Sequence, residues 1–189
     1  MKTLKLQFLL VITISLLFAC GEPKQAGRQV ASFSFTDQNG EPFGTDQLLG
    51  KVWIANFVFT NCNSVCTPMS HKMADLQTAA KEQGLEVEFV TFTVDPDSDT
   101  PQVLKDYLGQ FSDDESNWHL LTGYSQEAIE KLALNQFQTI VQMSGESGQV
   151  IHGTNFYVIS QQGHIVDEFS YIEESFKDQI LDKVERLVK

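Results

Sequence analysis

Two cysteines four positions apart are the residues of this sequence best suited to chemistry. Cys62 and Cys66 are separated by Asn63, Ser64 and Val65. In a segment that coils toward a helix, this spacing lets both sulfur atoms face the same side, where they suit either a disulfide or the shared coordination of one ion. Thiolates bind copper(I), zinc and iron–sulfur centres, and two of them are too few for a tetrahedral zinc site. We therefore expect a third ligand elsewhere in the chain.

The candidates for the third ligand are the histidines at positions 71, 119, 152 and 164. We expect His71 on the solvated face of a helix, and His119 and His164 in structural positions near a strand end and a turn. His152 lies between a polar loop and a predicted strand at 155–159. In the fold that the order of the elements predicts, the approach to that strand passes over the cysteine loop, so we predict that His152 is the third ligand.

The segments around the cysteines predict a strand, a loop and a helix. Residues 51–59 form a nearly continuous apolar and β-branched run, which is typical of a central strand buried on both faces. Thr67 is predicted to cap the following helix and Pro68 to occupy its first position. Cys66 would then lie at a helix start, where the macrodipole favours an anion, so its thiolate should form more readily than that of a free cysteine.

The rest of the chain predicts alternating strands and helices. Strands are expected at 31–35, 86–94, 118–121, 155–159 and 164–169, helices at 101–111, 125–137 and 175–188, and a Gly- and Ser-rich loop at 144–149. A turn at 37–40 predicts an N-terminal β-hairpin. This order implies an α/β fold with a mixed central sheet and helices on both faces. With a cysteine pair between the first long strand and its helix, the arrangement is thioredoxin-like.

Length and composition limit the possibilities further. The chain has 189 residues, of which 42% are hydrophobic, and this favours one folded domain. Its formal net charge is −12. A chain this acidic lacks the cationic field that binds phosphate backbones, so nucleic acid is excluded as an expected partner.

The N-terminus predicts export and lipid attachment. Two lysines precede an apolar run at 6–18, which is too short for a membrane-spanning helix and is typical of a secretory signal. Residues 17–21, Leu-Phe-Ala-Cys-Gly, resemble a bacterial lipobox. We therefore expect a signal peptide at 1–19, a lipidated Cys20 with a flexible tether at 20–29, and the folded domain at 30–189. Two acyl chains anchor stably where one does not, which would hold this protein at the cell membrane, facing outside the cytoplasm.

Three segments together resemble the Sco/SenC family, whose members are thioredoxin-fold copper proteins that help to assemble cytochrome c oxidase. Residues 59–69 resemble its FTxCxxxCPxM signature, residues 93–101 its VDPxxDTP segment, and residues 151–154 the stretch with its metal-binding histidine. The resemblance implies that Cys62, Cys66 and His152 bind copper and that Asp95 is a nearby acid that influences the site. One departure is Thr67, where the family usually has Pro.

The resemblance also implies a partner and an activity. The expected function is delivery of copper to the dinuclear copper centre of an oxidase subunit, by a protein that we expect to be monomeric. Two thiolates suit copper(I), and an added imidazole lets the same site hold copper(II). The alternative is a thiol-disulfide reductase that uses a Cys62–Cys66 disulfide to keep the oxidase cysteines reduced. Thr154 stands where redox thioredoxins have a cis-proline, which weakens that alternative. A third possibility, peroxide reduction by one reactive cysteine, needs a nearby cation to activate the peroxide, and these motifs contain no arginine.

Overall fold

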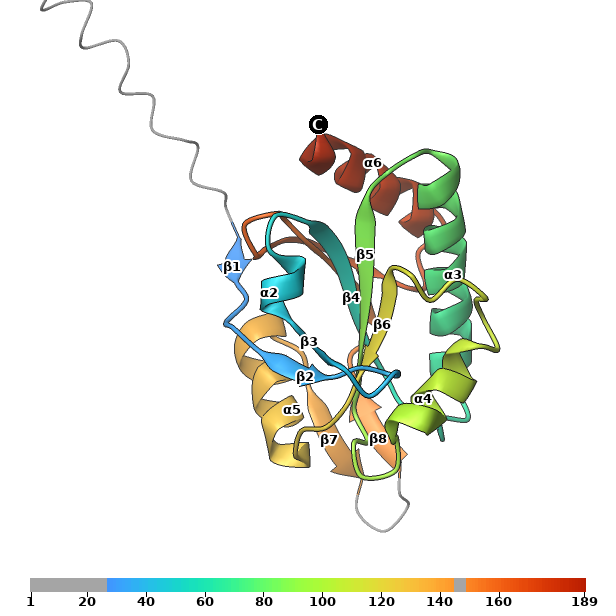
Figure 1. Ribbon diagram of the computed structural model, residues 1–189, viewed down its shortest axis with the longest axis vertical. Coiled ribbons are helices and arrows are strands. Elements are labelled where there is room, and N and C mark those ends of the chain that lie inside the picture. The colour runs from blue at the N-terminus through green and yellow to red at the C-terminus, as the bar shows by residue number, and fades with distance from the viewer. Residues whose placement is uncertain (1–26, 145–148) are drawn as a thin grey trace, which may run out of the picture.

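The computed structural model describes residues 27–144 and 149–189 (Figure 1). Its elements in chain order are β1 (Arg28–Gln29), β2 (Ser34–Thr36), β3 (Pro42–Gly44), α2 (Thr45–Leu48), β4 (Val52–Val58), α3 (Cys66–Glu82), β5 (Val87–Thr93), α4 (Pro101–Leu108), β6 (Trp118–Leu121), α5 (Gln126–Leu132), the π-helix η2 (Ala133–Phe137), β7 (Val141–Ser144), β8 (Gln149–His152), β9 (Asn155–Ile159), β10 (His164–Ser170) and α6 (Phe176–Val188). The expected signal peptide, Cys20 and the tether up to residue 26 lie outside the described residues.

A mixed sheet of six strands, in the order β1-β10-β9-β4-β5-β6, forms the centre of the fold. Strands β4, β5 and β6 are parallel to one another, whereas β9 runs antiparallel to β4. Every residue of β4 is buried, as expected for a strand covered on both faces. The predicted mixed α/β fold is therefore confirmed.

Helices and a hairpin cover the two faces of this sheet (Figure 1). Helix α6 contacts α3, β4 and β9 on one face. On the other face, the Phe137 ring of η2 packs edge-on against Phe57, with ring centroids 5.1 Å apart. The expected N-terminal hairpin is formed by β2 and β3, and its neighbour Phe33 packs against Trp53 and Phe92. The cysteine loop thus follows a strand whose position is fixed by apolar contacts on both sides.

The folded region begins before the expected boundary at Val30. Arg28 pairs with Ile165 and Gln29 with His164, so β1 is an edge strand of the central sheet. The Arg28 side chain also donates hydrogen bonds to backbone carbonyls of η2. The last residues of the segment predicted to be a tether are therefore part of the domain.

Helix α3 starts earlier than predicted. Its first residue is Cys66 and its N-cap is Val65, so Thr67 does not cap the helix and Pro68 is not its first residue. The Met69 N–H donates the first helical hydrogen bond to the Val65 carbonyl, at 3.0 Å. Pro68 therefore occupies a position where a backbone N–H has no helical acceptor, so its missing N–H costs the helix no hydrogen bond.

A second hairpin, β7–β8, occupies the region where the sequence pattern predicts only a polar loop. Val141 pairs with His152 and Met143 with Val150. The predicted loop at 144–149 lies at the tip of this hairpin, and residues 145–148 are outside the described part of the chain. His152 is thus the last residue of a strand, which holds its backbone more firmly than a loop would.

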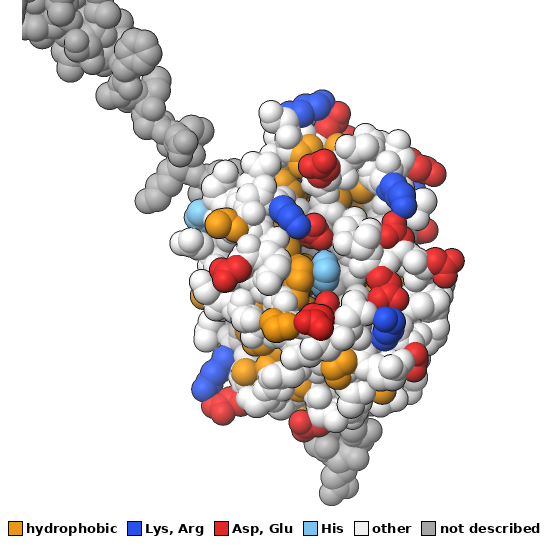
Figure 2. All heavy atoms as spheres, viewed as in Figure 1, with side chains coloured by type: hydrophobic (Ala, Val, Ile, Leu, Met, Phe, Trp, Pro, Cys, Tyr) orange, Lys and Arg blue, Asp and Glu red, His pale blue; other side chains and the backbone are white. Residues whose placement is uncertain are grey.

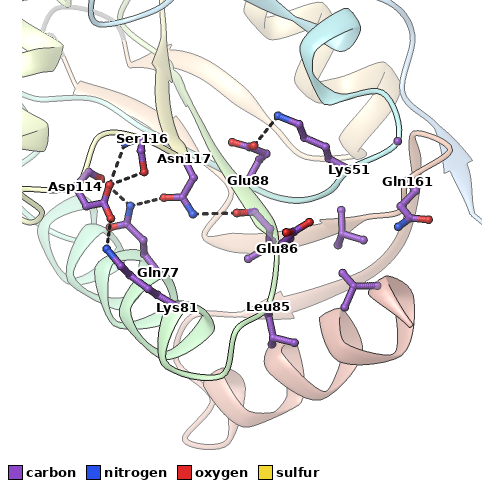
Figure 3. A pocket seen from close by; sticks show the side chains of 14 residues that line it. Lys51, Gln77, Lys81, Leu85, Glu86, Glu88, Asp114, Ser116, Asn117 and Gln161 are labelled. Atoms are coloured by element: carbon purple, nitrogen blue, oxygen red, sulfur yellow. Dashed lines mark hydrogen bonds and ion pairs between the residues drawn. The ribbon is translucent and has the colours of Figure 1, made fainter.

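A polar cavity of about 430 Å³ lies at the end of the sheet where β4 and β5 begin (Figure 3). Lys81 pairs with Asp114 at 2.6 Å, and Lys51 pairs with Glu88 at 2.7 Å, both at its wall. The cysteine loop follows the opposite end of β4. The cavity therefore lies at the far end of β4 from the cysteines, and it is not part of the site that they predict.

Candidate metal centre

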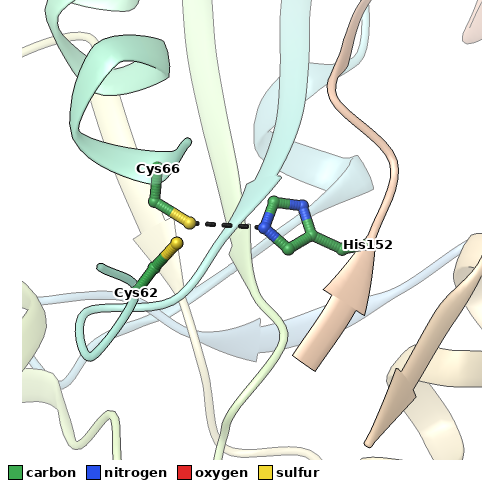
Figure 4. A group of neighbouring side chains, drawn as sticks. All are labelled: Cys62, Cys66 and His152. Carbon is green, nitrogen blue, oxygen red and sulfur yellow. Dashed lines mark hydrogen bonds between the residues drawn. The ribbon is translucent and has the colours of Figure 1, made fainter. Parts of the chain in front are cut away.

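The predicted ligand set converges in the structure. Cys62 precedes α3, Cys66 begins it, and His152 ends β8 and points toward both sulfurs (Figure 4). One ligand atom from each residue lies within 4.8 Å of the other two, and Cys66 Sγ is 3.3 Å from His152 Nε2. Sulfur ligands bind metals at about 2.3 Å and imidazole nitrogen at about 2.0–2.1 Å. A single ion therefore fits among these three atoms after a small adjustment of the side chains.

The protonation of His152 favours metal binding. His152 Nδ1 lies 2.9 Å from the Gly153 carbonyl oxygen, which can only accept a hydrogen bond, so Nδ1 carries the proton. Burial lowers the pKa of His152 and outweighs the opposing effect of this hydrogen bond, so the ring is neutral at neutral pH. Nε2 then has a free lone pair directed at the cysteines, in the arrangement usual for histidine ligands of metals.

The acidities of the two thiols differ from the expectation for Cys66. Burial raises the pKa of Cys66 well above its usual value, and the neighbouring Cys62 adds to this effect. Burial also opposes ionisation of Cys62, but hydrogen bonds with Cys66 and Ser64 outweigh it and lower the pKa of Cys62. The prediction that the Cys66 thiolate forms more readily than that of a free cysteine is wrong, because burial of Cys66 raises its pKa.

The two thiols are free in the structure, as a metal site requires. Neither Cys62 nor Cys66 takes part in a disulfide, and Cys66 is buried whereas Cys62 is partly exposed. Cys62 Sγ also lies 3.6 Å from Ser64 Oγ. An incoming thiol or metal donor would therefore reach Cys62 first.

A buried acid that the sequence analysis did not single out fixes the start of the cysteine loop. Asp99 is fully buried, and its carboxylate accepts hydrogen bonds from the Thr60 N–H at 3.2 Å and the Thr60 hydroxyl at 2.5 Å. The Thr93 hydroxyl, at the end of β5, donates to the same carboxylate. Asp99 thereby ties the residue two positions before Cys62 to the central sheet. Its place in the acidic 95–99 segment, directly after a buried strand, was the signal in the sequence.

Asp95 connects to this network through its backbone. Its N–H donates to the Thr93 hydroxyl at 3.1 Å, and Thr93 in turn donates to Asp99. Among residues 27–144 and 149–189, the group of three or more potential metal ligands within 4.8 Å consists of Cys62, Cys66 and His152, without Asp95. Asp95 is thus not a ligand in this group, and its backbone is linked through Thr93 to Asp99, which holds the start of the cysteine loop.

The other three histidines lie away from this group. His71 is exposed on α3, with its ring against Phe111. The His119 ring stacks on Phe43 with centroids 3.7 Å apart, and His164 begins β10. These positions agree with the structural roles that were expected for them.

Comparison with known proteins agrees with the fold and the motifs. The SCO1/SenC family model matches residues 21–189. A SCO1/SenC family lipoprotein from Bacillus anthracis is 47% identical, with a TM-score of 0.85, covering 89% of this chain and 100% of that one. BsSco, described as having a disulfide switch and as a member of the Sco family of cytochrome c oxidase assembly proteins, is 35% identical, with a TM-score of 0.79, over 88% and 97% of the two chains.

A more distant relative has been solved with its metal. Yeast Sco1 with copper bound is 28% identical, with a TM-score of 0.69, covering 84% of this chain and 89% of that one. The fold, the order of the three motifs and a family match over most of the sequence agree with one another. The chain belongs to the SCO1/SenC family.

Proposed function

We propose that Cys62, Cys66 and His152 bind one copper ion. The observation that carries this proposal is the 3.3 Å separation of Cys66 Sγ and His152 Nε2, which places an imidazole nitrogen beside the two thiols. Two soft thiolates suit copper(I), and the neutral imidazole adds a ligand that copper(II) prefers. One site can therefore keep its ion through a change of oxidation state. The copper-bound structure of the yeast relative supports copper over zinc.

The proposed role of the copper is delivery to the dinuclear copper centre of cytochrome c oxidase. BsSco is described as a member of a family of cytochrome c oxidase assembly proteins. The two proteins are 35% identical in an alignment that covers 88% of the present chain. In this proposal the protein hands copper to the copper-bearing subunit of the oxidase. The domain acts as a monomer, because one chain supplies all three ligands.

The proposed location is the outer side of the cell membrane. Residues 1–19 would act as signal peptide, Cys20 would receive the lipid, and the following residues would tether the domain that continues to residue 189. A relative that is 47% identical is described as a lipoprotein, which supports this assignment. In the described part of the chain, no helix is both long enough and apolar enough to cross a bilayer. Replacing Cys20 by Ser should release the protein from membranes and abolish its labelling by a radioactive fatty acid.

A thiol-disulfide reductase is the second candidate function. Two free thiols lie close together, and the thiol with the lowered pKa, Cys62, is the more exposed one, as a nucleophile in disulfide exchange would be. BsSco, which is described as having a disulfide switch, supports redox activity at the same cysteines. Metal binding and disulfide formation exclude each other at this site, because both use the same two sulfur atoms.

A copper titration of the reduced mature chain distinguishes the two functions. The Cys20→Ser variant, starting at residue 20, has Cys62 and Cys66 as its remaining thiols. We expect one copper(II) per chain and strong absorption from thiolate-to-copper charge transfer. A colourless mixture without defined stoichiometry would contradict the copper proposal and favour the reductase.

A further inference from the structure

Met143 lies on the same face of the β7–β8 hairpin as His152. Cross-strand partners in an antiparallel pair lie on the same face, and side chains alternate between the two faces along each strand. Val141 pairs with His152, and Met143 pairs with Val150. These four residues therefore share one face, and from this face His152 reaches the cysteines (Figure 4). The thioether of Met143 is thus on the side of the hairpin that faces the metal site.

The side chain of Met143 is partly open to solvent, unlike its neighbours on this face. Val141 is 5% exposed and Val150 is 7% exposed, whereas Met143 is 40% exposed. Of the other methionines in residues 27–144 and 149–189, Met69 and Met73 are fully buried. Apolar side chains reach the surface at several places on the face drawn in Figure 2, so exposure alone does not mark a functional residue. What distinguishes Met143 is that it shares its face with a metal ligand.

Met143 is also a near neighbour of His152 within this face. His152 pairs with Val141, two positions before Met143, so Met143 and His152 are diagonal neighbours across the two strands. Such neighbours lie about 7–8 Å apart, within reach of long side chains. Methionine is unbranched and flexible, and a partly exposed side chain can change rotamer without leaving a cavity in the core. The Met143 sulfur can therefore swing toward the space between His152 and the two thiols.

The thioether of Met143 favours one oxidation state of copper. Thiolates and thioethers are soft ligands that select copper(I), whereas imidazole nitrogen also suits copper(II). The hairpin and the cysteine loop thus offer two sets of three ligands. The first consists of Cys62, Cys66 and His152, and the second has Met143 in place of His152. The second set consists of sulfur atoms alone and suits copper(I) only.

We propose that Met143 is an alternative third ligand for copper(I), which replaces His152 when the ion enters or leaves the site. This inference rests on the proposed copper binding. In the exchange, the bond between copper(I) and His152 Nε2 breaks and a bond to the Met143 sulfur forms. Each side chain supplies a lone pair, so no proton or electron moves and copper keeps its oxidation state. Because Met143 is partly exposed, a partner's ligand can reach an ion that it holds.

Copper(I) affinity in the absence of His152 tests this inference. His152→Ala retains both cysteines and Met143, so its copper(I) affinity should fall less than about tenfold, although its copper(II) affinity falls at least about 100-fold. In His152→Ala/Met143→Leu, copper(I) affinity should fall by at least about a further tenfold. Anaerobic competition with the chelator bicinchoninate measures both values. Leucine has nearly the volume of methionine and no sulfur, so the substitution removes the ligand and preserves the packing.

Gln142→Leu is the matched control. Gln142 precedes Met143 in the same strand, is exposed, and lies on the opposite face, where it pairs with Ile151. His152→Ala/Gln142→Leu should bind copper(I) like His152→Ala. With His152 present, Met143→Leu alone should leave copper(II) affinity unchanged, because copper(II) stays on the imidazole.

Methionine labelled with ¹³C in its ε-methyl group reports ligation by sulfur directly. Comparison with Met143→Leu assigns the Met143 signal in the NMR spectrum. When copper(I) is added to His152→Ala, this signal should shift. The signal of Met73, which is buried about 10 Å along α3 from Cys66, is the internal reference and should move less.

The outcomes separate this inference from the copper proposal. If His152→Ala and His152→Ala/Met143→Leu bind copper(I) equally well, Met143 is not a ligand and the site of Cys62, Cys66 and His152 stands. If wild type binds copper in neither oxidation state, the copper proposal is overturned and this inference with it. If Met143→Leu weakens copper(II) binding as much as copper(I) binding, or if Gln142→Leu has the same effect as Met143→Leu, the shape of the hairpin is responsible and the assignment of the sulfur ligand is overturned.

Discussion

Cys66 Sγ and His152 Nε2 lie 3.3 Å apart although 86 positions separate them in the chain. Two elements produce this contact. Helix α3 begins at Cys66 itself, and β8 ends at His152 with its side chain on the buried face of the hairpin. Because secondary structure fixes both backbones, the contact is set before any metal arrives, and a preorganised site loses less entropy on binding.

Removing the imidazole should separate copper binding from thiol chemistry. In the His152→Ala variant we expect copper(II) affinity to fall at least about 100-fold. Removing a residue that only orients a metal ligand lowers affinity by about 10- to 100-fold, and removing the ligand itself should lower it at least as much. Oxidation of the thiols to a disulfide should continue, since both sulfurs remain. Competition with a chelator measures the first effect and mass spectrometry the second. His71→Ala, on the exposed face of α3, is the control. Equal copper affinity in His152→Ala and wild type would remove His152 from the ligand set.

The two thiols should differ in reactivity in the metal-free protein. The pKa of Cys62 is lowered and the side chain is partly exposed, whereas burial raises the pKa of Cys66. Iodoacetamide should therefore modify Cys62 first, at a rate that rises with pH through a midpoint below the usual value for a cysteine. Peptide mapping after brief exposure identifies the modified residue. Modification of Cys66 ahead of Cys62 would show that our assignment of the acidic thiol is reversed.

The sequence predicts the strands and helices that position the site better than it predicts the acidity of the thiols. The apolar run at 51–59 is enough to predict a buried strand that presents the cysteines, and the order of elements is enough to bring His152 to them. The acidity of Cys66 could not be predicted, because it depends on burial by segments distant in sequence. The hairpin was missed for a related reason: Val141 and Val150 are buried by residues distant in the sequence, whereas the polar segment between them predicts a loop.

Asp99 should make stability depend on pH. Burial raises its pKa above the usual value of an aspartate, so the folded protein holds this proton more tightly than the unfolded chain does. This contribution to stability is fully present below the unfolded pKa of about 3.9 and is lost as pH rises through the folded pKa. The Asp99→Asn variant has no titrating group at this position and serves as the reference. As pH rises from the unfolded to the folded pKa of Asp99, the free energy of unfolding of wild type should fall relative to that of the variant. At higher pH the difference between the two proteins should be constant.

Urea denaturation of both proteins at several pH values measures this difference. Asp178→Asn, at an exposed position in the first turn of α6, is the control for general effects of removing a carboxylate. A difference between wild type and Asp99→Asn that stays constant from pH 3 to pH 8 would contradict the assignment. Asp99→Ala should destabilise the protein by about 1–3 kcal/mol, because the Thr60 N–H and two hydroxyls would lose their acceptor.

Gly153 should be required for the position of His152. A Cβ at Gly153 would lie 1.8 Å from Thr139 Oγ1 and 3.1 Å from Thr139 Cβ, so these segments can only pack this closely without a side chain. The Gly153 carbonyl also accepts the hydrogen bond from His152 Nδ1. In Gly153→Ala, the strand end must therefore move away from Thr139 and take His152 with it. We expect weaker copper(II) binding and a loss of stability of about 1–3 kcal/mol, typical of overpacking.

A double-mutant cycle with Thr139→Gly tests this steric cause. Thr139→Gly alone removes a side-chain hydrogen bond with Tyr157 and should destabilise the protein. Added to Gly153→Ala, the same substitution removes the clashing atoms, so the double variant should be more stable than the sum of the single changes predicts. Its copper(II) affinity should recover toward that of wild type. Strict additivity of the two substitutions, in stability and in copper affinity, would mean that contact with Thr139 does not set the position of His152.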